Sequence, residues 1–167
     1  EVDTVGRSSL PPSAIRYPLS AIPYPLSAIR YPLSASHLLA LWLPAAQPDP
    51  SEATWLRRRF PGRLWIAVEL LTTGQDRRRL ESLQQLGREV GLPLVATGDV
   101  HMHARGRRAL QDVLTATRLG VPVEQAGYAL FPNGERHLRP RMRLEELHPP
   151  ELLTATCEIA ARCTFSL

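Results

Sequence analysis

The sequence predicts an α/β fold, and three observations in its middle third support that prediction. Residues 64–70 and 94–97 are short apolar runs bounded by turn residues, which is typical of buried parallel strands. Between them, residues 75–90 repeat leucine and valine at helical spacing. A strand, a helix and a second strand within about 35 residues form a βαβ unit.

Residues 1–36 are predicted to have no fold of their own. Residues 13–33 are three near-identical heptapeptides, SAIRYPL, SAIPYPL and SAIRYPL, each with a proline before its last leucine. Proline inside a helix removes a hydrogen bond and clashes with the preceding turn, which argues against a coiled coil. Three short units are also too few for a solenoid. We expect a disordered, low-complexity repeat here; a docking peptide is the alternative.

The ordered domain is expected over residues 37–167, beginning near Leu38. Residues 38–43 form a short apolar run that ends before Pro44, as a buried strand would. Asp49 then marks the start of a helix, because aspartate is a favoured N-cap and the proline that follows it fits the first helical position.

Three further helices are predicted from spacing and end signals. The helix over residues 75–90 should end at Gly91, a natural C-cap. A second helix is expected over residues 107–119, followed by an irregular stretch rich in proline and glycine over 121–140, and a last helix over 150–163. The residues expected to be buried are Ala109, Leu110, Val113 and Leu114 on the second helix and Leu152, Leu153, Cys157, Ile159 and Ala160 on the last, with Cys163 at least half-buried.

Composition narrows the class of protein. The length of 167 residues suits one domain, and no apolar run approaches the roughly 18–20 residues of a membrane span. Nothing near Glu1 looks like a signal peptide, and two cysteines six residues apart fit a reducing, cytoplasmic location. All 20 basic residues are arginine and the net charge is +4. Such a charge permits nucleic-acid binding, but short arginine groups are more typical of solvated helix faces.

The residues most suited to chemistry follow the strand over 94–97. Asp99 and His101 stand at its carboxyl end, where α/β folds place ligands. If the strand continues, residues two apart point the same way, so a carboxylate and an imidazole could share one zinc or manganese ion. His103 would extend that face unless a turn intervenes, and Glu69 could face the same pocket from the preceding strand. The alternative is a structural role, in which Asp99 caps the next helix.

Several catalytic signatures are absent from the 167 residues. There is no glycine-rich phosphate loop and no GxSxG, and no paired Asp-x-Asp of the kind that holds two Mg²⁺ ions. The sequence therefore gives this chain no polymerase-type chemistry of its own.

Longer strings nevertheless resemble a known family. LPLVATGDVHMHARGRRALQDVLTATRLG, RRFPGRLWIAVEL, GYALFPNGERHLRPR and HPPELLTATCEIAARC are similar to the bacterial error-prone DNA polymerases, C-family enzymes related to the DNA polymerase III alpha subunit. The likeness covers about residues 38–167 and implies the C-terminal half of an amino-terminal PHP domain (polymerase and histidinol phosphatase), a distorted β/α barrel. It carries over a metal-binding role at two positions, Asp99 and His101.

The resemblance has departures that shape the expected function. The HxH motif that normally opens a PHP domain does not precede Leu38, and the palm aspartates would lie beyond Leu167. The resemblance therefore implies a fragment of a polymerase that uses DNA, dNTPs and Mg²⁺ in replication and translesion repair, with a sliding clamp and other translesion proteins as partners. The alternatives are a PHP-type metal-dependent phosphoesterase and a non-enzymatic gene remnant with open strand edges and an uncovered core face.

Overall fold

A computed structural model describes residues 37–164 of the chain. The heptapeptide repeat, and with it the prediction of a disordered leader over residues 1–36, lies outside this range. The described residues fall into two compact units, one made of 37–111 with 132–164 and a smaller one made of 112–131. The larger unit contains the sheet and the predicted site.

The larger unit is built on three parallel strands. These are β1 (Ala40–Trp42), β2 (Leu64–Glu69) and β3 (Leu94–Thr97), in the order β1-β2-β3. Trp42 lies beside Ile66, and Val68 lies beside Ala96. The predicted α/β class and the βαβ unit are therefore confirmed. β1 is shorter than the predicted run because Pro44 follows closely and offers no backbone N–H.

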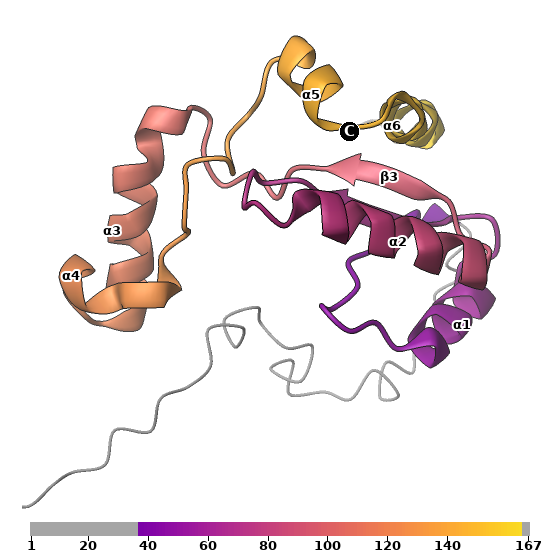
Figure 1. Cartoon of the computed structure of the whole chain (residues 1–167), viewed down its shortest axis with the longest axis horizontal. Coiled ribbons are helices and arrows are strands. Elements are labelled where there is room, and N and C mark those ends of the chain that lie inside the picture. Colours follow the sequence, from indigo (N-terminus) through magenta and orange to yellow (C-terminus); the bar gives the residue numbers. More distant parts are fainter. Residues whose placement is uncertain (1–36, 165–167) are drawn as a thin grey trace, which may run out of the picture. The chain divides into compact units, whose positions relative to one another are not determined.

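Helices α1 (Pro50–Arg59) and α2 (Asp76–Val90) cover one face of this sheet (Figure 1). The Asp49 side chain caps α1 by accepting from the Ser51 N–H at 2.8 Å, as the sequence predicts. Gly91 ends α2 in the left-handed conformation, with φ 64°. The core between helices and sheet centres on three fully buried side chains, those of Ile66, Val68 and Leu83.

Helix α6 (Pro150–Arg162) packs on β3 from the opposite side of the sheet to α2 (Figure 1). Ala155 and Ile159 contact Trp65 and Val95 there, so part of the second face is covered. The predicted burial of the cysteines is wrong. Cys157 and Cys163 are exposed, because the inward stripe of α6 runs through Leu152, Ala155 and Ile159 at helical spacing and bypasses both.

Arginine side chains join separate elements of this unit. They donate to backbone carbonyl oxygens that end strands, helices and turns, and most of these bonds span more than 30 residues of sequence. Several arginines thus hold separate elements of the fold together, whereas their clustering in the sequence suggests only a solvated role. The donor and acceptor pairs are Arg57 with Val90, Arg63 with Leu38, Arg79 with Pro44 and Ala45, Arg139 with Leu70, and Arg162 with Gly62.

The remaining elements differ most from prediction. A 3-10 turn, η4 (Arg105–Arg107), leads into α3 (Arg108–Leu119). The face of α3 expected to be buried is exposed, with Leu110, Val113 and Leu114 each about half accessible, while Thr115 and Ala116 are buried. Periodicity predicts that a helix has an apolar face, but it does not place the surface that covers that face within the same segment.

The stretch predicted to be irregular contains short helices. They are α4 (Val123–Ala126) and a 3-10 turn, η5 (Gly127–Ala129), in the smaller unit. In the larger unit α5 (Arg141–Leu147), which the sequence reading missed, follows Pro140. Across residues 37–164, no helix is both long enough and apolar enough to span a membrane.

Candidate functional site at the carboxyl end of the sheet

The predicted site lies in the turn that follows β3. The strand ends at Thr97 and does not continue to Asp99, whose φ of 43° places it in the left-handed region. Aspartate tolerates this conformation better than most residues other than glycine. Of the two possibilities left open by the sequence, a continuing strand and a turn, the structure has the turn, and it brings the side chains of Asp99 and His101 together.

Asp99 contacts two basic side chains. Its Oδ1 lies 3.1 Å from His101 Nε2, and its Oδ2 accepts a hydrogen bond from Arg136 Nε at 2.8 Å. The Arg136 side chain is only 14 % exposed, whereas those of Asp99 and His101 are about one-third and two-fifths exposed. A charge-assisted bond of this length with a largely buried guanidinium is a strong one.

The segment 133–139 closes this end of the sheet. The Arg136 carbonyl accepts from the N–H groups of His101 and Met102 at 2.9 and 3.1 Å, and the Leu138 N–H donates to the Met102 carbonyl at 3.0 Å. Met102 and His137 form a parallel bridge. The turn after β3 and a segment more than 30 residues further along the chain are thus hydrogen-bonded like two short strands.

The same segment also reaches the end of β2. Asn133 Nδ2 donates to the Leu71 carbonyl at 2.7 Å, and Arg139 Nη1 donates to the Leu70 carbonyl at 2.9 Å. The carbonyls beyond a strand end have no ladder partner and need one when they are buried. One segment of irregular backbone supplies these donors to the carboxyl ends of two adjacent strands.

The same segment contains a buried pair of charged side chains. The side chains of Glu135 and Arg139 are 7 % and 2 % exposed, and Glu135 Oε2 lies 3.7 Å from Arg139 Nε. Arg105 approaches the other Glu135 oxygen at 3.3 Å from the solvent side. Burial lowers the pKa of the Arg139 guanidinium, and the Glu135 carboxylate opposes that shift.

His148 is buried, with 3 % of its surface exposed. Burial lowers the pKa of its imidazole because the charged form loses hydration, and the charge of Arg139 lowers it further. The Asp76 carboxylate acts in the opposite direction, but the net shift is downward. His148 is therefore held neutral at pH 7.

The structure brings together two of the residues considered as metal ligands, Asp99 and His101. His103 is exposed on the turn, and Glu69 lies at the end of β2 beside Thr97. Within residues 37–164 no group of three or more His, Cys, Asp or Glu side chains is arranged to hold a metal ion. Protein zinc sites use three or four protein ligands, so the pair alone is an incomplete donor set.

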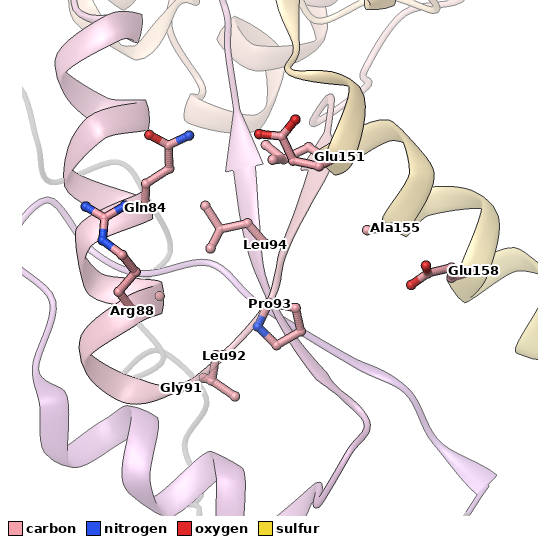
Figure 2. A pocket seen from close by; sticks show the side chains of 11 residues that line it. Gln84, Arg88, Gly91, Leu92, Pro93, Leu94, Glu151, Ala155 and Glu158 are labelled. Carbon is pink, nitrogen blue, oxygen red and sulfur yellow. The ribbon is translucent and has the colours of Figure 1, made fainter.

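A groove is present at the opposite end of β3. It has a volume of about 570 Å³ and lies between α2 and α6, above the residues that enter β3 (Figure 2). Gln84 and Arg88 line it from α2, and Glu151 and Glu158 line it from α6. The groove is thus separated from Asp99 by the length of the strand and does not extend the candidate site.

Comparison with known proteins bears on the family resemblance. No family model matches the chain. It is 62 % identical over 129 residues to the error-prone DNA polymerase of Dechloromonas aromatica, and 57 % and 55 % identical over 129 and 130 residues to those of Methylococcus capsulatus and Pseudomonas aeruginosa. The resemblance to error-prone DNA polymerases is confirmed. The matches cover 77–78 % of this chain but only 12–13 % of each relative, so the chain spans about an eighth of their length.

Sequence reasoning missed the residues that complete this strand end. Asn133, Glu135, Arg136 and Arg139 come from a stretch without hydrophobic periodicity, and no spacing rule links them to Asp99. In the sequence, these residues are indicated only by the string GYALFPNGERHLRPR, which contributes to the family resemblance as a whole. No single residue of the string pointed to a place beside Asp99.

Proposed function

We propose that this chain is a segment of an error-prone DNA-directed DNA polymerase and serves there as a structural part of a PHP-like domain, without activity of its own. The observation that carries the proposal is an identity of 62 % to a polymerase of that name over 129 residues, about an eighth of its length. Such identity over most of a chain supports a shared role for the shared segment.

The geometry supports a structural role for the segment. At the strand ends, Arg136 bonds to Asp99, and Asn133 and Arg139 bond to backbone carbonyls. A nucleotidyl transferase needs paired carboxylates that hold two metal ions, and the sequence contains no such pair. Polymerisation would therefore be performed by parts of the protein other than this segment.

The remaining features of the proposal follow from the polymerase role. The whole protein would extend DNA primers with dNTPs and Mg²⁺ during replication and repair synthesis across damage, in the cytoplasm, in contact with a sliding clamp and other translesion proteins. The segment, residues 37–167, would contribute about half of the domain, with the repeat over 1–36 as a separate leader. A divalent ion at Asp99 and His101 would require further ligands from outside the described residues.

Genomic sequence downstream of the codon for Leu167 tests this proposal. We expect one open frame that continues into a region with paired aspartates in the spacing of a two-metal polymerase site. A stop codon directly after Leu167 would contradict the proposal that the chain is part of a complete polymerase. It would favour the alternative of a non-enzymatic gene remnant.

A further inference from the structure

We infer that Arg136 provides the cation for Asp99 in this protein, so that Asp99 and His101 form a charge-paired joint between the turn after β3 and the segment 134–138 and not a metal site. The inference goes beyond the proposed polymerase role and does not depend on it. It rests on three features of the larger unit: the contacts of Asp99, the way in which Arg136 is held, and the donor set around the pair.

Both carboxylate oxygens of Asp99 are in use. Oδ2 accepts from Arg136 Nε at 2.8 Å, and Oδ1 lies 3.1 Å from His101 Nε2. That imidazole nitrogen is also one of the two atoms through which a histidine can bind a metal. A metal ion between Asp99 and His101 would therefore take the place of the hydrogen bond that now joins them.

Arg136 is fixed in place by its own backbone. Its carbonyl accepts two hydrogen bonds, from the N–H groups of His101 and Met102, and the next residue forms the bridge to Met102. With its side chain only 14 % exposed, the guanidinium has little room to leave Asp99. A divalent cation bound to the same carboxylate would face a fixed positive charge at close range, which opposes binding.

The surroundings do not supply the ligands that could offset this repulsion. Among residues 37–164 no third His, Cys, Asp or Glu side chain completes a group with the pair. The nearby acid Glu135 is directed to Arg105 and Arg139. The chemistry of the donor set, one carboxylate already bound to a guanidinium and one imidazole, does not fit zinc or manganese.

A double-mutant cycle on the full 167-residue chain tests the pairing, with Asp99→Asn and Arg136→Gln measured by thermal unfolding. Asparagine keeps the tolerance for a left-handed φ, so the substitution removes the charge and not the turn. Each single variant should unfold several degrees below the wild-type chain. The double variant should unfold no lower than the less stable single variant, because the second substitution changes a side chain whose partner is already lost. His103→Gln, on the same turn, is the matched control and should leave the midpoint unchanged.

Two results would overturn the inference. The first is additivity of the two single effects, which would mean that Asp99 and Arg136 do not interact. The second is metal content: after dialysis against Zn²⁺ or Mn²⁺ and removal of free metal, we expect the wild-type chain to hold far less than one ion per chain by mass spectrometry. About one ion per chain, lost in the Asp99→Asn variant, would show that the pair is a metal site.

Discussion

At the scale of single residues, this chain depends on arginine as a structural side chain. Arg79 donates from Nη2 to the Pro44 carbonyl at 2.6 Å and from Nη1 to the Ala45 carbonyl at 3.0 Å, so that α2 holds the chain that leaves β1. A guanidinium can make two such bonds at once, because its donors are arranged in a rigid fork. Lysine carries the same charge but lacks that geometry.

Replacing Arg79 by lysine should therefore lower the free energy of unfolding by about 1.5–3 kcal/mol, the range for a hydrogen bond to a charged group. Urea unfolding followed by circular dichroism measures this difference. The control is Arg77→Lys, since Arg77 is 91 % exposed and pairs with Glu81 on the helix surface. Its effect should stay within about 0.5 kcal/mol. Equal effects at the two positions would rule out the fastening role of Arg79.

His148 gives the fold a dependence on pH. Its pKa is lowered by burial, and then by Arg139, below its ordinary value of 6.5. The unfolded chain takes up a proton as the pH falls through that value, while the folded chain does not. The folded state is therefore most stable above about pH 6.5 and loses stability at lower pH, by at most about 1.4 kcal/mol per pH unit from this group.

The variant His148→Gln should remove the part of the pH dependence of the free energy of unfolding that comes from this group. We expect the free energy of unfolding of the wild-type chain to fall between pH 7 and 5.5, and that of the variant to change less over the same interval. Denaturant unfolding at several pH values provides the measurement, with His37→Gln as an exposed control that keeps the wild-type slope. A variant with an unchanged slope would mean that His148 is not the group responsible.

At the scale of elements, the parts best predicted from the sequence are those whose neighbours are near in the chain. The run over 64–70 became β2, the leucine spacing over 75–90 became α2, and Gly91 ended it, because local patterning and local turns specify these elements. The strand end was predicted only in part. Asp99 and His101 do meet, but the Arg136 side chain reaches Asp99 from a segment more than 30 residues away, which no local pattern encodes. A backbone bridge between Met102 and His137 holds that segment beside the turn.

Helix α3 is a second case in which the sequence predicts only part of the structure. Its apolar positions were recognised, yet Leu110, Val113 and Leu114 are exposed. Hydrophobic patterning indicates that a helix face is apolar, but the surface that covers this face is formed by other parts of a protein. The chain spans only about an eighth of the length of its relatives.

The packing of α2 on the sheet leads to a prediction at Gly87. A Cβ at this position would overlap Leu94 Cδ1 and lie 3.0 Å from the Leu92 carbonyl oxygen. Although alanine favours helix over glycine by about 1 kcal/mol, Gly87→Ala should destabilise the chain by about 1–3 kcal/mol, because the packed Leu94 side chain or the helix must shift to make room. Gly106→Ala, where a Cβ meets nothing within 4 Å, should be neutral or slightly stabilising. Thermal unfolding of the two variants compares them, and a stabilising Gly87→Ala would contradict the close packing.

At the scale of the whole molecule, the fold supports the proposal that the chain is a structural segment of a larger enzyme. The three-stranded parallel sheet is covered by α1 and α2 on one face and partly by α6 on the other. Its strand ends are closed by one buried and one partly exposed ion pair. The sequence lacks the paired carboxylates of a polymerase centre. Together with the likeness to error-prone DNA polymerases, this supports the proposal that the chain has a structural part in such an enzyme.

A segment exchange tests this account most directly. The 129-residue matched stretch of the Dechloromonas aromatica polymerase would be replaced by the corresponding residues of this chain, and primer extension with dNTPs and Mg²⁺ measured. We predict that the chimera extends primers at a rate comparable to the unmodified enzyme, and that the 167-residue chain alone extends none. A well-folded chimera that fails to extend primers, or extension by the chain alone, would contradict the account.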